Sequence, residues 1–337
     1  MRKLEIITTL CLILLSIVPA IADEPVKVKV GFYLTDIYAL NFSDKHYTAQ
    51  FWAWFNHSSK SFNVKSGIEL PNSRNYKVLN YVQKEMNGNF LTQVKYETQL
   101  NHQWNSTFYP FDRQKIVLCL ESSDLDSAKI KLIGDAAGSG VSPDIRLAGW
   151  TIEKMKMKIE DHAYKTSFGD PDLRMNLPSV YSRILFEVDL KRHGWRLLFN
   201  DFTGFFFAIA ISGIVLVLDS MRSLFGKIPH STKISMGTSS LFASVGAAYV
   251  LQSRMPSTPI FTFADAIQTT AFVATLMAIV SSMSIEIIQN TDRMFMFDLS
   301  TKEKQTDFAL WFNRGTLGLF ILIVLFDSLV LAKAVYS

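Results

Sequence analysis

The stretch ISMGTSSLFASVGAAYVL, residues 234–251, decides the fold class of the chain. It carries no charge and is apolar enough to cross a bilayer, for which about 20 such residues are needed. It also holds two glycines and a series of serine and threonine hydroxyls. The stretch therefore predicts a transmembrane helix with one face that tolerates water.

Three more apolar segments accompany this stretch in the C-terminal part of the 337-residue chain. They are residues 202–218, 266–285 and 315–332, and the last contains one acid, Asp327. Each is close to the length that a spanning helix needs. The pattern predicts an all-α transmembrane domain over residues 193–337. Its four helices are expected at about 197–218, 233–253, 261–288 and 311–333.

The N-terminal part has a different pattern, in which short runs of alternating apolar and polar residues are separated by turn residues such as MNGN (86–89) and GDAAGSG (134–140). Such alternation, rich in Thr, Val, Tyr and Trp, is typical of antiparallel strands in a sandwich. It predicts an all-β, immunoglobulin-like sandwich over residues 23–192. Examples of the expected strands are 26–34, 47–55, 90–100, 115–122 and 150–159, and the last strand is expected at 182–190.

Residues 1–22 have the features of a secretory signal peptide. Arg2 and Lys3 precede an apolar run, and Ala20 and Ala22 supply the small residues that a signal peptidase needs. Cleavage near Ala22 would export the sandwich and remove Cys11. Cys119 would then be the one cysteine of the mature chain, so no intramolecular disulfide is expected.

The basic residues agree with this orientation. An exported sandwich places residues 219–233 and 286–314 in the cytoplasm, and only Arg254 lies between the second and third helices. The two cytoplasmic loops contain Arg222, Lys227, Lys233, Arg293, Lys302, Lys304 and Arg314. This positive-inside bias predicts a multi-pass protein of the cell membrane, with its N-terminal domain extracellular or periplasmic and its C-terminus on the same side.

Composition excludes some functions. The net charge is +4 and the basic residues are scattered, which does not favour a nucleic-acid partner. The sequence contains no metal-ligand spacing, nucleophile elbow or phosphate-binding loop. We therefore expect no enzymatic activity, cofactor or metal site.

One face of the second helix carries the candidate functional residues. Positions that follow one another at about 100° per residue share that face. They are Ser235, Ser239, Phe242, Gly246, Tyr249 and Ser253. Around a common axis this stripe would line a pore, because hydroxyls can replace part of an ion's hydration shell and an apolar ring can close a pore by dewetting. Close helix packing within one subunit explains small and hydroxyl residues equally well, and Thr238, Ser240 and Ser244 lie off the stripe.

Four further stretches carry a family resemblance. They are YPFD (109–112), MPSTP (255–259), LAGWTIEK (147–154) and IADEPVKVKVGFYLTDIYAL (21–40). Together with the order of sandwich and helices, they resemble the pentameric ligand-gated ion channels, the Cys-loop receptor superfamily, and in particular its bacterial proton-gated members. The absence of a cysteine pair around Tyr109 is similar to the prokaryotic members.

The resemblance implies a homopentameric channel opened by a small-molecule agonist or by protons, with the second helix lining the pore and Phe242 at its gate. Membrane lipids and permeant ions would be its other partners. The gating-coupling residues would be Tyr109, Pro110, Phe111 and Asp112 in a loop that pushes on the linker Pro256 to Pro259, with Lys191 or Arg192 before the first helix. We expect Asp112 to pair with Arg192.

The ligand site is implied less sharply. A loop over residues 161–181 would offer Tyr164, Phe168 and Tyr181 to an agonist, since aromatic faces attract cations, although packing within the sandwich explains each ring equally well. For protons, the titratable candidates are Glu69, His102, Asp112, Glu121 and His162, and no spacing selects one of them.

Several positions depart from the family pattern. Near the cytoplasmic mouth the chain has His230 and Lys233 where cation-selective members have a glutamate, so local charge would favour anions. Asp201 is expected at the water boundary of the first helix, and Asp327 in an unidentified contact with a subunit or a lipid headgroup. The alternative function is a non-conducting, membrane-anchored binding or signalling protein of the same fold.

Overall fold

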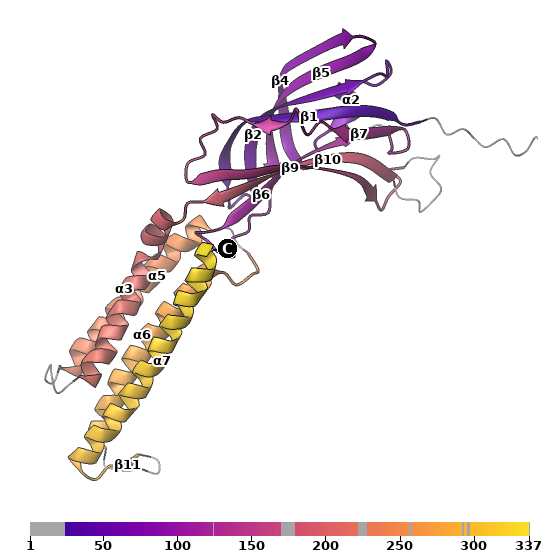
Figure 1. Cartoon of the computed structure of the whole chain (residues 1–337). Helices are drawn as coiled ribbons and strands as arrows, with labels where there is room; N and C mark the ends of the chain where they lie inside the picture. The colour runs from indigo at the N-terminus through magenta and orange to yellow at the C-terminus, as the bar shows by residue number, and fades with distance from the viewer. Residues whose placement is uncertain are drawn as a thin grey trace, which may run out of the picture.

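The computed structural model describes residues 24–123, 125–169, 179–221, 228–255, 258–291, 293–294 and 297–336. A β-sandwich comes first and four long helices follow it, so the predicted fold class is confirmed (Figure 1). The predicted signal peptide, residues 1–22, and Pro256 of the predicted linker lie outside the described residues.

The sandwich consists of two sheets. The larger has the order β4-β5-β2-β1-β7, with β8 also paired to β1, and the smaller has the order β3-β6-β10-β9. The larger sheet contains β1 (Val26–Asn41), β2 (His46–His57), β4 (Ser73–Met86), β5 (Asn89–Asn101), β7 (Ile130–Gly134) and β8 (Gly140–Val141). The smaller contains β3 (Ile68–Glu69), which follows the short helix α2 (Val64–Gly67), and β6 (Arg113–Ser122), β9 (Trp150–Tyr164) and β10 (Ser179–Arg192).

Aromatic side chains join the two sheets. Phe32 of β1 stacks on Phe186 of β10 with ring centroids 4.3 Å apart, and Phe51 of β2 lies 4.8 Å from the ring of Phe32. The hydroxyl of Tyr47 crosses the core to donate to the carbonyl of Val117, at 2.9 Å. These side chains come from the alternating apolar positions of the sequence, because every second residue of a strand faces the same side.

Strand β4 was not expected from the sequence. It lies at the edge of the larger sheet, and most of its side chains are exposed on both faces, so it lacks the alternation that marks a half-buried strand. A two-residue turn joins it to β5. Asn87 and Gly88 both have positive φ, which is the conformation that Asn-Gly hairpin turns favour.

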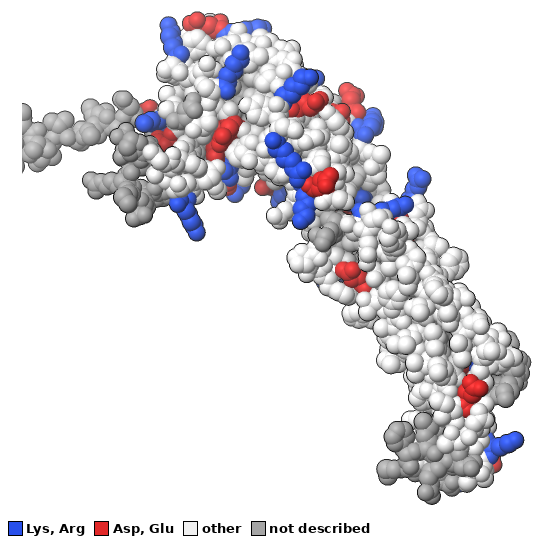
Figure 2. Space-filling model, turned by 180° about the vertical axis from the view of Figure 1, so that it is seen from behind, with Lys and Arg blue, Asp and Glu red and all other residues white. Residues whose placement is uncertain are grey.

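The four helices are α3 (Trp195–Ser220), α5 (His230–Arg254), α6 (Phe263–Gln289) and α7 (Lys302–Tyr336), with a short hairpin of β11 (Arg293–Met294) and β12 (Phe297–Asp298) before α7. All four are long and apolar enough to cross a membrane. On the face in Figure 2, charged side chains gather over the sandwich and are sparse over the helices. The protein is therefore a multi-pass membrane protein.

The helix starts differ from the predicted bounds, by two or three residues in α3 and α5, which begin at Trp195 and His230 and not at about 197 and 233. Helix α7 begins at Lys302 and not near residue 311, because its polar first turns continue the helix below the apolar segment. Helix α6 begins at Phe263 and not at about 261, because Thr262 and Asp265 form a capping box that starts the helix at this point.

The helices form one bundle below the sandwich, and the last turns of α7 return towards the sandwich (Figure 1). Helices α3 and α5 approach closely at Gly204. A Cβ atom at this position would lie 2.7 Å from the Cβ of Ala247, so only glycine allows the contact. Below, the junction end of a helix is the end near the sandwich, and the distal end is the opposite one.

Candidate functional site

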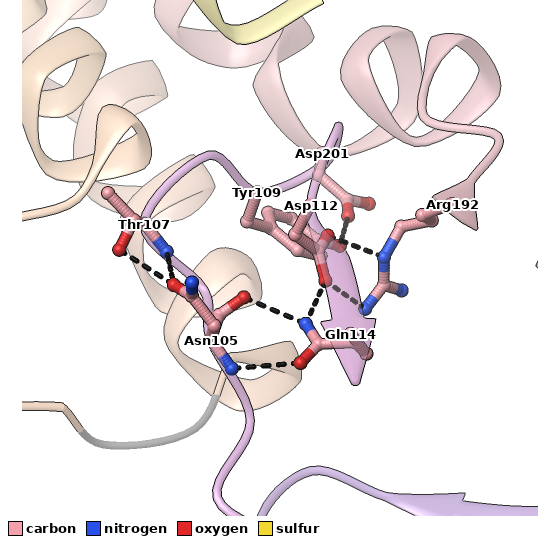
Figure 3. Close-up of polar contacts among 7 residues, drawn as sticks. All are labelled: Asn105, Thr107, Tyr109, Asp112, Gln114, Arg192 and Asp201. Carbon is pink, nitrogen blue, oxygen red and sulfur yellow. Dashed lines mark hydrogen bonds and ion pairs between the residues drawn. The ribbon is translucent and has the colours of Figure 1, made fainter. Parts of the chain in front are cut away.

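The segment between β5 and β6, residues 102–112, connects the sandwich to the helices and is called the junction loop. Its shape is fixed by Gln114 at the start of β6 (Figure 3). The Gln114 amide accepts from the backbone N–H of Asn105 at 2.9 Å and donates to the carbonyl of Asn105 at 2.7 Å. It also donates to Asp112 Oδ2 at 2.5 Å. The loop therefore presents Asp112 in a fixed orientation.

Asp112 pairs with Arg192, the last residue of β10 (Figure 3). Arg192 Nε donates to Asp112 Oδ1 at 2.7 Å, and Nη2 donates to Oδ2 at 3.2 Å. Two parallel contacts of this kind are the strong, orienting form of an arginine–carboxylate pair. The side chains are only 8% and 2% exposed. The expected pair is thus present as a contact, and its part in gating stays a prediction.

Three aromatic rings surround the Arg192 guanidinium. They belong to Phe42, Tyr109 and Trp150, at 4.6, 5.2 and 4.1 Å from the guanidinium carbon to the ring centroids. A cation is attracted to the face of an aromatic ring, and more so when both are removed from water. The rings therefore stabilise the buried charge together with Asp112. Lys191, the other basic candidate, is half-buried and has no ion pair within the described part of the chain.

Tyr109 connects the junction loop to helix α3 (Figure 3). Its hydroxyl donates to Asp201 Oδ2 at 2.6 Å, and the other carboxylate oxygen accepts from Arg254 at the end of α5. Burial, followed by the hydrogen bond to this carboxylate, raises the pKa of Tyr109, so the hydroxyl keeps its proton and remains a donor. The Asp201 side chain is fully buried between these two partners, and its expected place at the water boundary of the first helix stays a prediction.

The other members of the loop contact the beginnings of two helices. The carbonyl of Pro110 approaches Gly194 so closely that a Cβ there would lie 2.2 Å from its oxygen. Phe111 packs edge-on against Trp195 at 5.1 Å, and the backbone N–H of Phe263 donates to the carbonyl of Thr107 at 2.8 Å. The contacts thus reach the first residues of α3 and α6. Pro259 of the predicted receiving linker is exposed.

The stripe on helix α5 is exposed in the single chain. All six of its residues are exposed, and the two aromatic members, Phe242 and Tyr249, are 73% and 78% exposed. On the opposite side, Ser240 and Ser244 are fully buried. Ser240 Oγ donates to the carbonyl of Ala208 at 2.9 Å and lies 3.0 Å from Thr275 Oγ1. On the stripe, Ser239 and Ser253 are exposed and donate within the helix, to the carbonyls of Ser235 at 2.9 Å and Val250 at 2.7 Å. The buried hydroxyl of Ser240 contacts neighbouring helices, whereas these exposed hydroxyls contact only their own helix.

Lys233 does not supply the free charge expected at the cytoplasmic mouth. It is buried at the distal end of α5 and pairs with Asp219 of α3, whose other oxygen accepts from Ser282 at 3.4 Å. An intramembrane cation is costly unless it is paired, which explains why the lysine points away from the stripe. The premise that Lys233 is a free charge is therefore wrong, and the ion preference itself stays a prediction. Arg222 and Lys227 of the same loop lie outside the described residues.

The three aromatic candidates for ligand binding lie together at the far end of the smaller sheet. The ring of Tyr164 is 5.1 Å from that of Phe168 and 5.9 Å from that of Tyr181, in edge-on contacts. Beneath them, the Tyr164 hydroxyl donates to Glu121 at 2.6 Å, and Arg183 pairs with the same carboxylate at 2.7 Å. Burial, with this carboxylate, raises the pKa of Tyr164 to about 12. Residues 170–178 of the expected loop lie outside the described residues.

The proton-sensing candidates have different surroundings. Glu121 and Asp112 are buried in ion pairs, whereas Glu69 is exposed. His162 packs edge-on against Tyr164 at 4.5 Å. His102 packs against Trp104 at 4.4 Å, and its Nε2 atom is buried with no hydrogen-bond partner among the described residues. His102 thus combines a half-buried ring with a buried nitrogen atom that lacks a hydrogen-bond partner among the described residues.

Sequence reasoning missed the roles of Asp201, Arg254 and Gln114. A carboxylate inside an apolar helix is itself a sign of a specific partner, and Asp201 had that signal.

Asp327 of α7 is half-buried, and its Oδ2 atom has no hydrogen-bond partner in the described part of the chain. Among the described residues, no three His, Cys, Asp or Glu side chains are placed to hold a metal ion.

Comparison with known proteins gives one relative. The chain is 22% identical over 272 residues to a protein named "Proton-gated ion channel" from Gloeobacter violaceus, a stretch that covers 74% of this chain and 70% of the relative. No family model matches the chain. A stretch of 272 residues is longer than either the sandwich or the helical bundle, so the similarity extends over both parts.

Proposed function

We propose that this chain, which resembles the pentameric ligand-gated ion channels through both of its parts, is one subunit of a homopentameric channel of that family. The exposed stripe of helix α5 carries the proposal. Ser235 and Ser239 leave their hydroxyls on the same surface as Phe242, while the hydroxyls on the opposite side are used in packing. Hydroxyl groups on such a stripe find no hydrogen-bond partners in lipid. In an assembly of five copies around an axis, the stripes would line a central pore and contact its water.

The same assembly gives the junction a purpose. The sandwich would lie on the extracellular or periplasmic side, where the agonist is met. The Asp112–Arg192 pair joins the junction loop to the last strand before α3, so a rearrangement of the sandwich would be transmitted to the helices at this point. Removing one partner of a buried ion pair costs about 3–5 kcal/mol because the other charge is left uncompensated, so we expect either single substitution to disturb this connection.

Protons are the first agonist to test, because the relative from Gloeobacter violaceus is named a proton-gated channel. The cluster of Tyr164, Phe168 and Tyr181 supports a small amine as the second candidate, since aromatic faces attract cations. The rings now contact one another, so an amine would have to separate them.

Voltage-clamp recording from purified protein in planar bilayers tests the proposal. We expect a current after an acid step from about pH 7.5 to about pH 3.5, which spans the ordinary pKa values of histidine and of the carboxylic acids, or after addition of an amine or amino acid. In Ser239→Cys, a charged thiol reagent should abolish most of this current.

Ser244→Cys is the matched control, since Ser244 lies on the same helix but is fully buried, and the native Cys119 is buried in the sandwich. Its current should not respond to the reagent. A wild-type protein that binds one of the tested amines or amino acids and carries no current would favour the alternative function, a non-conducting binding protein. The bulky Phe242 and Tyr249 on the stripe are the observation that supports that second candidate.

A further inference from the structure

Helices α3 and α5 are tied together at three levels. At the junction end, Arg254 of α5 pairs with Asp201 of α3. Near the middle, Ser212 and Ser240 face each other with their hydroxyl oxygens 3.4 Å apart. At the distal end, Lys233 of α5 pairs with Asp219 of α3. The two basic residues near the ends of α5 are thus each neutralised by an acid near the corresponding end of α3.

These ties resist a sliding motion between the two helices. Asp201 is 0% exposed, and Asp219 and Lys233 are 6% and 4% exposed, so a shift of one helix turn would leave buried charges without partners. Such groups are costly in an apolar medium. The close contact of Gly204 with Ala247 adds a steric restraint, because displacement would bring larger neighbours into the same space.

Asp201 has a second contact that reaches outside this helix pair. It accepts the Tyr109 hydroxyl of the junction loop at 2.6 Å while it accepts Arg254 of the pore helix on its other oxygen. One buried carboxylate therefore joins the sandwich, the first helix and the end of the pore helix. This connection does not pass through the linker between α5 and α6.

We propose that α3 and α5 move as one unit when the channel opens, and that Asp201 is the positioning residue through which the junction loop moves this unit. The inference rests on the proposed function. It differs from a mechanism in which the loop pushes only on the linker at residues 256–259 and α5 moves against a stationary α3.

A reversible cross-link between α3 and α5 tests the shared motion. Ser212→Cys with Ser240→Cys places two sulfur atoms where two hydroxyls now lie 3.4 Å apart, and molecular iodine can oxidise the pair to a disulfide inside the membrane. We expect the oxidised variant to keep its maximal current and half-activating stimulus within about two-fold. Each single cysteine variant, treated identically, is the control. Loss of activation on oxidation, restored by a reductant, would overturn the shared motion.

A double-mutant cycle tests the role of Asp201. Tyr109→Phe and Arg254→Gln should each shift the half-activating stimulus, and their combination should depart from additivity by about three-fold or more, as expected for groups that share a partner. The coupling should vanish in an Asp201→Asn background and return in part with Asp201→Glu, and the single-channel conductance should not change. Additive effects in the wild-type background would contradict the proposal.

Arg113 supplies the matched control for this cycle. It pairs with Glu153 at 2.5 Å in the same region of the sandwich, but both side chains are partly exposed, so Arg113→Gln should combine additively with Arg254→Gln. If the wild type carries no current, the proposed function fails and the same cycle is measured in unfolding temperature. Additive changes in that temperature would overturn Asp201 as the shared acceptor.

Discussion

His102, at the start of the junction loop, places a titratable imidazole beside the side chain that holds Asp112. Burial lowers the pKa of His102, and contact with Gln114 opposes this shift in part. The present arrangement therefore favours neutral His102. An exposed imidazole binds a proton as pH falls through the ordinary histidine pKa of about 6.5, whereas the buried imidazole stays neutral to lower pH. Over this range the present arrangement loses stability relative to any state that exposes His102. Below the lowered pKa the buried imidazole is protonated as well, and the loss does not grow further. We predict that His102→Gln shifts acid activation to lower pH.

His57 is the matched control for this prediction. Burial also lowers its pKa, and its Nε2 atom likewise has no partner among the described residues, but it lies at the opposite end of β2 from the junction. His57→Gln should reduce the pH dependence of the unfolding temperature in the same range and leave the activation curve unchanged. Equal shifts of activation in both variants, or no shift in His102→Gln, would remove His102 as a sensor.

At this scale the sequence predicted one contact and missed another of similar geometry. The Asp112–Arg192 pair was expected, because both residues match motif positions of a family. The Tyr109–Asp201–Arg254 connection was not, because residues 109, 201 and 254 meet only once the loop, α3 and α5 are folded together. The rings of Phe42 and Trp150 around Arg192 were missed for the same reason. Periodicity within one element carries no information on such contacts.

Phe242 is the most exposed apolar residue of the middle of helix α5, with hydroxyl residues of the stripe on its distal side. If its ring closes the pore by excluding water, Phe242→Ala should leak at rest or open with about a ten-fold weaker stimulus, which corresponds to about 1.4 kcal/mol of lost closed-state stability. Leu241→Ala is the control, since Leu241 is a less exposed neighbour off the stripe. Unchanged sensitivity without leak in Phe242→Ala would exclude a gate at this level.

Element types followed from the sequence more readily than element ends. The apolar segments gave the four helices, but the start of α7 was set too late because its polar first turns resemble a loop in a hydropathy profile. Edge strand β4 was missed because both of its faces are largely exposed. On α5 the polar residues of the sequence alone did not show which serines face a pore and which pack against other helices. Burial distinguishes the two kinds of serine, since Ser240 and Ser244 are buried and Ser235 and Ser239 are exposed.

For the whole molecule, the charges of the helical bundle cancel in pairs near both ends of α5. Arg254 meets Asp201 at the junction end, Lys233 meets Asp219 at the distal end, and the six stripe residues between them are uncharged. Selectivity by sign comes from rings of charged side chains or from dipoles that face the pore. A pore lined by this stripe would therefore discriminate weakly between Na⁺ and Cl⁻, in contrast to the anion preference inferred from Lys233 as a free charge.

A reversal-potential measurement in a NaCl gradient tests this consequence. Because the Lys233–Asp219 pair is neutral and buried, the double variant Lys233→Met with Asp219→Asn should keep the wild-type reversal potential, whereas Ser239→Glu adds five carboxylates to the stripe of a pentamer and should move it towards the Na⁺ equilibrium potential. Changing both members of the pair together avoids a lone buried charge, which would itself destabilise the bundle. A double variant that shifts the reversal potential as far as Ser239→Glu does would mean that Lys233 faces the ions after all, and that α3 and α5 separate at their distal ends when the pore opens.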